Sequence, residues 1–463
     1  MDENKAPQPQ EDYLEDYGYK QEFKRVLKLR HLVFYGLAYI TPTAPFPMLG
    51  IVAIASAGHM ASAYLVAMFA LLFTAASYGK MAARYPFAGS SYSYTQRAIH
   101  PHAGFLVGWA LFMSYLLVPL LSVIAARDLC VDIAPSVPSW LWIVLFVAFM
   151  TIVNLLGIRV TTGANAAMTG AMVVAAALFV ALAIRSLLAG EGEGVLFSIK
   201  PFYNPKTFDT SLILAATAIS VFSYIGFDGV STLAEEVEKP RVNIGRATIL
   251  TCLFSGIIFV IVAYMSQMVW PDYQNLPEDV SAVLHISRKM GGEPFRIFVF
   301  LIMIVAAVSS ALAGQTSAAR LMYGMGRDKV LPKKIFAYVS KKYQIPTYNV
   351  ILIAVISLVL AFIFNFKLAA EVLNFGAFLG FVAVNLCVIV EYNIRNKKES
   401  LGLLGVWRYI IMPVVGFLVC GKIFLSLSDT ALTYGTLWMA LGLIYYAILT
   451  KGFKKIVKVK LED

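Results

Sequence analysis

One carboxylate stands out in this sequence because it lies inside an apolar run. Asp228 belongs to the stretch FSYIGFDGV (Phe222–Val230), where glycine also occurs twice. A charge at the centre of a bilayer costs about 2.5–3.5 kcal/mol on insertion scales, so ionisable residues in such segments are candidates for function. Asp228 could bind the ammonium group of a ligand or carry a proton. Alternatively, it could accept amide hydrogen bonds at the start of a half-helix.

A second unusual stretch is YITPTAPFPMLG (Tyr39–Gly50), in the middle of the apolar run Leu32–Ala57. Its three prolines each remove a backbone donor and clash with the preceding turn, so the helix is expected to be interrupted there. Unwound backbone at membrane depth is tolerated only within protein or beside a water-filled cavity. The free ends of two half-helices carry partial charges that can bind a polar ligand. A single proline would equally indicate a simple kink, whereas three prolines with two threonines favour a binding site.

These two interruptions predict a substrate site. Its expected contacts come from the interrupted segments and from spans 3 and 8: Tyr39, Thr41, Thr43, Ala44, Pro45, Tyr115, Phe222, Ser223, Tyr224, Gly226, Asp228 and Ser309. Asp228, Glu235 and Glu236 are the predicted coupling or gating residues. The two glutamates are expected to pair with Lys239 or Arg241. For the polar groups of spans 3 and 8, the alternative is an ordinary interhelical hydrogen bond.

The elements that position these residues follow from composition. The chain has 463 residues, of which 59% are hydrophobic and 14% are charged. Soluble domains contain about 25% charged residues. A helix needs roughly 20 mostly apolar residues to cross a membrane, and the sequence contains twelve such runs. Because the runs do not alternate, they exclude a β-barrel and predict an all-α polytopic membrane protein with twelve transmembrane helices.

The two interruptions fall in the first and sixth predicted spans. Matching broken helices in two five-helix halves are typical of inverted-repeat transporters with the LeuT-type 5+5 fold, in which spans 1 and 6 are unwound. The predicted organisation has five parts: an N-terminal tail with an amphipathic, interfacial segment (1–31), a first repeat of spans 1–5 (32–190), a second repeat of spans 6–10 (208–396), spans 11–12 (405–450) and a basic tail (451–463).

The net charge of +11 has a topological explanation. Most of the 38 lysines and arginines lie in the N-terminal tail and in every second loop, most densely in Arg320–Lys342. Because positive loops stay in the cytoplasm, both termini are expected there, in a multi-pass protein of the plasma membrane. The partners we expect are membrane lipid, a small-molecule substrate and a proton, and nucleic acid is excluded.

The sequence offers no set of residues for catalysis. The four cysteines form no close pair, and no two histidines have ligand spacing. Disulfides, metal sites and cofactors are therefore not expected. An enzyme would need an activated nucleophile with its base, or a metal cluster, so the chain is predicted not to be one.

Three long stretches resemble a known family. SYGKMAARYPFAGSSYSYTQRAIHPHAGFLVGW (Ser77–Trp109), SYIGFDGVSTLAEEVEKPRVNIGRA (Ser223–Ala247) and AARLMYGMGRDKVLPKKIFAYV (Ala318–Val339) resemble the amino acid–polyamine–organocation superfamily. The likeness extends over essentially the whole chain and is strongest to bacterial putrescine importers. The resemblance implies the LeuT-type fold, alternating access, and uptake or exchange of amino acids or amines, often driven by protons.

The sequence departs from that family in three places. The first span lacks the Gly-Ser/Thr-Gly stretch that cradles a carboxylate in amino-acid members, and no acidic residue lies near Pro47, as it does in putrescine importers. In span 5, Met172 occupies the position where some members carry a lysine. The predicted function is a secondary active transporter that imports or exchanges a small amine-bearing solute with proton coupling. The alternative is a membrane sensor that binds substrate without net transport.

Overall fold

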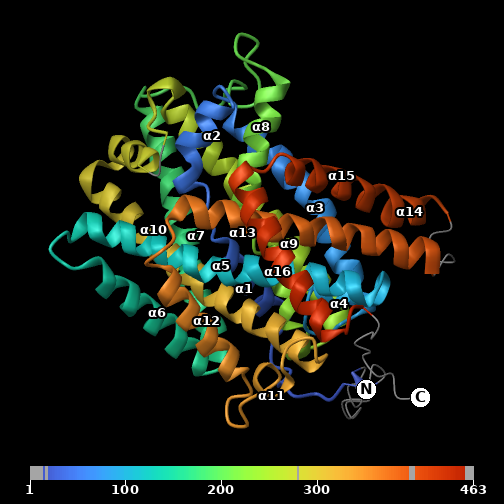
Figure 1. Ribbon diagram of the computed structural model, residues 1–463. Coiled ribbons are helices and arrows are strands. Elements are labelled where there is room, and N and C mark those ends of the chain that lie inside the picture. Colours follow the sequence, from blue (N-terminus) through green and yellow to red (C-terminus); the bar gives the residue numbers. More distant parts are fainter. Residues whose placement is uncertain (1–13, 16–18, 279–280, 396–401, 454–463) are drawn as a thin grey trace, which may run out of the picture.

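The computed structural model describes residues 14–15, 19–278, 281–395 and 402–453, and these are built from helices joined by loops (Figure 1). The first half contains α1 (Leu29–Ile40), the 3₁₀ helix η2 (Phe46–Met48), α2 (Leu49–Ala55), α3 (Met60–Arg84), α4 (Ser91–Ala98), α5 (Pro101–Ile133), α6 (Ser139–Leu155) and α7 (Ile158–Leu188). The middle contains α8 (Thr210–Ser220), the 3₁₀ helices η3 (Val221–Tyr224) and η4 (Phe227–Glu236), α9 (Pro240–Val269), the 3₁₀ helix η5 (Tyr273–Asn275) and α10 (Ala282–Arg327).

The remaining helices complete the described chain. They are α11 (Lys333–Phe336), α12 (Thr347–Leu360), α13 (Phe366–Ile389), the π-helix η6 (Val390–Arg395), α14 (Leu403–Val406), the π-helix η8 (Trp407–Ile411), α15 (Met412–Leu425) and α16 (Asp429–Leu449).

Nine helical segments within the described ranges are long and apolar enough to cross a membrane. Three shorter apolar helices, Phe46–Ala55, Ser139–Leu155 and Thr347–Leu360, lie where the sequence predicts spans 1, 4 and 9. The predicted all-helical, multi-pass membrane class is therefore confirmed.

The central helices pack in pairs that are distant in sequence. α3 lies along α9, and α5 lies along both α10 and α13. The first pair approaches closely because glycine faces glycine: a Cβ added to Gly79 would lie 3.1 Å from the Cα of Gly245. Small residues let membrane helices approach to this distance and gain van der Waals contact.

Two faces of the molecule are used below as landmarks. The terminal face is the one at which α1 begins and α16 ends, and the far face is the opposite one, at which α2 and α5 end. In Figure 1 the label α2 lies toward the top, at the far face, and the label α11 lies at the bottom, at the terminal face. The first part of α10 is a short helix of its own, separated from the long part by a bend at Gly292 (φ 68°).

The segment before α1 differs from the prediction. An interfacial helix was expected before His31, but residues 20–28 are not helical. Phe23 and Leu27 are buried against the protein, and the amides of Val26 and Leu27 donate to the Glu236 carbonyl at 2.9 and 3.0 Å. The apolar residues of this segment are thus covered by the terminal face of the protein itself. The part of the tail at residues 1–13 lies outside the described residues.

Candidate functional site

The first predicted interruption is present between α1 and α2. α1 ends at Ile40, and Thr41 follows with a left-handed backbone (φ 64°). In a continuous helix the Tyr39 carbonyl would accept from the amide of Thr43; here it accepts from the Ser310 hydroxyl of α10 at 3.0 Å. At this carbonyl the main chain therefore bonds to a neighbouring helix instead of to its own helix.

The second predicted interruption is also present, between η3 and η4. Ile225 is extended (φ −62°, ψ 131°), and Gly226 has φ 121°, a conformation that other residues rarely adopt. The continuation is a buried 3₁₀ helix of 10 residues rather than an α-helix. The Tyr39 ring packs directly on this segment, because a Cβ at Gly226 or Gly229 would lie 2.9 or 2.2 Å from ring atoms of Tyr39. The two interruptions are thus in direct contact.

This contact makes a prediction about Gly229. Replacing Gly229 by Ala would force Tyr39 from its place, since the new methyl group would also lie 2.8 Å from the Ser317 hydroxyl. We expect a loss of about 1–3 kcal/mol in the free energy of unfolding, typical of overpacking, together with reduced transport. The control is Gly170→Ala in α7, where an added Cβ meets nothing within 4 Å. Thermal unfolding of both variants checks this, and equal stability would show that the Tyr39 contact is loose.

Asp228 lies in the first turn of η4 and is 1% exposed. Its Oδ2 accepts a hydrogen bond of 2.5 Å from the Tyr115 hydroxyl of α5. Its Oδ1 is buried and has no hydrogen-bond partner among the described residues. The sequence offered helix capping as an alternative role for Asp228. In the structure Gly226 is the N-cap residue of η4, and Asp228 lies two residues after it. The carboxylate therefore keeps one acceptor oxygen available, which is the arrangement needed to receive an ammonium group or a proton.

A cavity of about 320 Å³ lies between the interrupted segments, α5, α10 and α13. Six of the predicted contacts line it: Tyr39, Thr41, Thr43, Ala44, Phe222 and Ser223. The other six do not line it in this conformation: Pro45, Tyr115, Tyr224, Gly226, Asp228 and Ser309. The Tyr224 hydroxyl donates to the Tyr64 carbonyl of α3 at 2.9 Å. The Ser309 hydroxyl is buried without a hydrogen-bond partner in the described chain.

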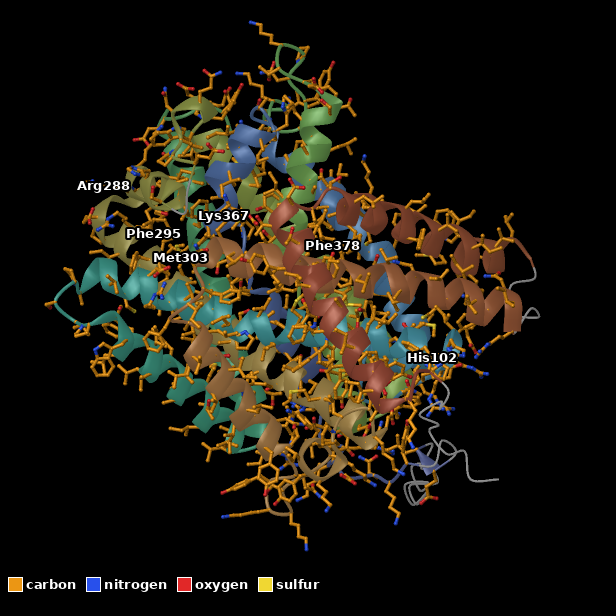
Figure 2. The ribbon with its side chains drawn as sticks, in the orientation of Figure 1. His102, Arg288, Phe295, Met303, Lys367 and Phe378 are labelled. Carbon is orange, nitrogen blue, oxygen red and sulfur yellow. The ribbon has the colours of Figure 1, made fainter. Side chains whose placement is uncertain are left out.

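The sequence analysis missed much of the cavity wall. Twelve residues outside the predicted contacts come from α5, α10 and α13: Val118, Leu121, Ser122, Ala125, Asp128, Leu129, Met303, Ala306, Ala307, Ser310, Phe366 and Leu373. Three more, Ile40, Pro47 and Ile225, belong to the interrupted segments. Met303 and Phe378 are labelled in Figure 2, on α10 and on α13 respectively. Val118, Ser122, Ala125 and Leu129 could have been found, since residues three, seven, ten and fourteen positions after Tyr115 lie toward its side of the helix. This spacing does not reach Leu121 or Asp128.

Two buried ion pairs close the site toward the terminal face. Glu236 accepts from Arg320 at 2.7 and 3.3 Å, and Glu235 accepts from Arg327 at 2.6 Å. The amide of Ala88 also donates to Glu235 at 2.9 Å. The predicted partners Lys239 and Arg241 were therefore wrong: the cations come from α10, which lies beside η4.

The segment before α1 adds a second layer under these ion pairs. The Tyr19 hydroxyl donates to Asp328 at 2.8 Å, and the Arg327 guanidinium lies over the Tyr19 ring at 3.6 Å from its centroid. Tyr92 donates to the other oxygen of Asp328 at 2.8 Å. Burial, followed by the charge of Asp328, raises the pKa of Tyr19, so this phenol keeps the proton that it donates. The terminal side of the site is thus closed by two layers of buried polar contacts.

Comparisons with known proteins identify the family of the chain. The sequence model of the family described as amino acid permease matches residues 31–458. The chain is 37% identical over 433 residues to the low-affinity putrescine importer PlaP of Escherichia coli (strain K12), covering 94% of this chain and 95% of that protein. It is 25% identical to the branched-chain amino acid permease BcaP of Bacillus subtilis (strain 168), covering 94% and 95% of the two chains. It is also 27% identical to the mitochondrial cationic amino acid transporter 3 of Arabidopsis thaliana, over 84% of this chain and 66% of that protein.

Proposed function

Because the chain belongs to the amino acid permease family, we propose that it is a secondary carrier that imports or exchanges a small amine-bearing solute by alternating access. The chain is a multi-pass membrane transporter and not an enzyme, as the sequence predicts. The observation that carries the proposal is the contact between two interrupted helices beside a buried carboxylate that has one unpartnered oxygen, Asp228 Oδ1.

The cavity favours a cation over a carboxylate as the ligand. Its lining, within the part of the chain that is described, contains Asp128 and no lysine, arginine or histidine. The segment Thr41–Pro47 includes three residues without a backbone donor, so it makes a poor nest for a carboxylate. The threonine hydroxyls and the freed carbonyls are acceptors for an ammonium group. These features, with the likeness to a putrescine importer, support an amine such as putrescine as the substrate.

The same proposal includes the topology. We assign twelve spans by adding the three shorter apolar helices to the nine long segments of the described chain. α3 packs along α9, and α5 packs along α10. In the proposed topology these contacts join span 2 to span 7 and span 3 to span 8. Each of these pairs occupies equivalent positions in two inverted repeats, 32–190 and 208–396. The distribution of lysines and arginines supports a cytoplasmic terminal face, and in our proposal the substrate enters this plasma membrane carrier from the far face.

Proton coupling through Asp228 completes the proposal. Met172 of α7 is fully buried with Ile302 and Ala306 of α10, so this position provides no titratable group. Of the acids in the interrupted segments, Glu235 and Glu236 are each paired with an arginine. Asp228 has an available oxygen and no cationic partner in the described chain, so we assign proton transfer to it. The relatives are named as importers, permeases and transporters, and we therefore set aside the alternative of a sensor without transport.

The test is a thermal-shift panel of amino acids, monoamines and diamines on purified protein, followed by counterflow in liposomes with the ligands that stabilise it. We expect putrescine to raise the unfolding temperature and to exchange across the membrane. If only amino acids stabilise the protein and support counterflow, the substrate is an amino acid and not an amine such as putrescine. A stabilising ligand that lacks any amine would overturn both substrate classes.

A further inference from the structure

The cavity carries one charged side chain that the proposed function does not use. Among the described lining residues, Asp128 alone is charged. It lies near the end of α5 at the far face, and its side chain is 53% exposed. Asp228, by contrast, is buried near the inner end of the cavity and does not line it. A carboxylate therefore lies in solvent contact at the outer end of a cavity that we propose to bind a cation.

Asp128 forms an ion pair with Arg127, but its carboxylate can still bind a cation. The Arg127 guanidinium contacts Asp128 Oδ1 at 2.7 Å and also donates to the Ala361 carbonyl at the end of α12 at 2.9 Å. Arg127 does not line the cavity. The Arg127 side chain is 18% exposed, but the carboxylate of Asp128 is half exposed, and an ion pair with a solvated partner contributes only about 1 kcal/mol. An arriving ammonium group can therefore replace the Arg127 contact at little cost, while Arg127 keeps its hydrogen bond to α12.

The two carboxylates are too far apart to bind one small amine together. Tyr115, which donates to Asp228, and Asp128 lie on the same helix, thirteen residues apart. That separation corresponds to about 20 Å along α5 at the helical rise. A four-carbon diamine is much shorter, so it must contact the two acids one after the other.

The wall between the acids is mainly apolar. Val118, Leu121, Ala125 and Leu129 of α5 face Phe222, Met303 and Phe366 across the cavity. Apolar walls suit the methylene groups of an alkyl amine, and low-dielectric walls focus the field of a charge at the mouth.

We propose that Asp128 is an entry site that captures the ammonium group of the substrate at the far face before it moves inward toward Asp228. The proposal rests on the proposed function, because it assumes an amine substrate. It assigns Asp128 to the capture step, and it leaves the later transport steps to the interrupted helices.

The test compares Asp128→Asn with wild type for putrescine uptake into proteoliposomes in the far-face-out orientation. We expect KM to rise roughly fivefold while kcat stays within about twofold, since only an exposed charge contact is lost. Added salt should slow uptake by wild type more than by the variant, because salt screens the attraction to Asp128. The matched control is Asp429→Asn, an exposed acid at the start of α16 that does not line the cavity.

A second variant keeps the test decisive. Arg127→Gln should lower KM, because it frees Asp128 from its cationic neighbour. If wild type takes up putrescine normally and Asp128→Asn changes neither KM nor the salt dependence, the entry site is wrong while the proposed function stands. If Asp128→Asn does not fold, an unchanged KM in Arg127→Gln overturns the entry site in the same way. Absence of any amine uptake by wild type would instead show that the proposed function is wrong and would remove the entry site with it.

Discussion

Asp228→Asn is expected to lower putrescine uptake at least about thirtyfold, because removing one partner of a buried charge pair costs about 2–5 kcal/mol of binding. Asn keeps the shape of the side chain and can still accept from Tyr115, but it carries neither charge nor an exchangeable acid proton. Because the substitution removes a buried charge with an unpartnered oxygen, folding should be preserved. Uptake of labelled putrescine into proteoliposomes, with and without a pH gradient, measures the effect.

Tyr115→Phe is the control for this prediction. It removes the 2.5 Å hydrogen bond to Asp228 but retains the carboxylate, so its uptake should fall less than that of Asp228→Asn. The unfolding temperatures of both variants establish that they are folded. If Asp228→Asn transported at the wild-type rate with the same response to the pH gradient, Asp228 would have no part in binding or coupling.

Arg320→Met is expected to cause the largest loss of stability, about 3–5 kcal/mol in the free energy of unfolding, because it leaves Glu236 as an unpaired buried charge. The side chains of Arg320 and Glu236 are only 4% and 2% exposed. Replacing both residues, as Arg320→Met with Glu236→Gln, should recover most of the loss, since no buried charge then remains. Thermal or denaturant unfolding of the two single variants and the double variant gives the coupling energy directly.

The same helix offers a matched control. Arg296 of α10 pairs with Glu293, and these side chains are 35% and 47% exposed. Exposed pairs contribute at most about 1 kcal/mol, so Arg296→Met should change stability little. If Arg320→Met and Arg296→Met lower the free energy of unfolding by similar amounts, burial does not determine how much the Arg320–Glu236 pair contributes to stability.

The interruptions could be predicted because they arise from local chemistry. Proline removes a donor wherever it occurs, and Gly226 adopts a backbone that few other residues tolerate. Both act through residues adjacent in sequence, and the prediction of Tyr39, Thr43 and Phe222 as cavity residues followed from their positions at these breaks.

The ion pairs could not be predicted, because they depend on packing between distant segments. Glu236 and Arg320 are 84 residues apart in sequence. Sequence proximity favoured Lys239 and Arg241, but the contact of η4 with α10 decides the partner. The outer part of the cavity posed a different problem. Asp128 lies on the same helix as Tyr115, but thirteen residues at about 100° each turn it to a different face, and the sequence does not reveal how far along α5 the cavity extends.

The account depends most on the claim that the amine occupies the cavity between the two interrupted helices and reaches it from the far face. Ala44→Cys tests this directly, since Ala44 lines the cavity at the first interruption and the four native cysteines are all buried. A membrane-impermeant thiol reagent applied at the far face should modify this cysteine, and saturating putrescine should slow the modification. Ala189→Cys, exposed at the far face outside the cavity, should react at a rate that putrescine does not change. If putrescine is transported by the Ala44→Cys variant but does not change the rate at which this cysteine is modified, the account is contradicted.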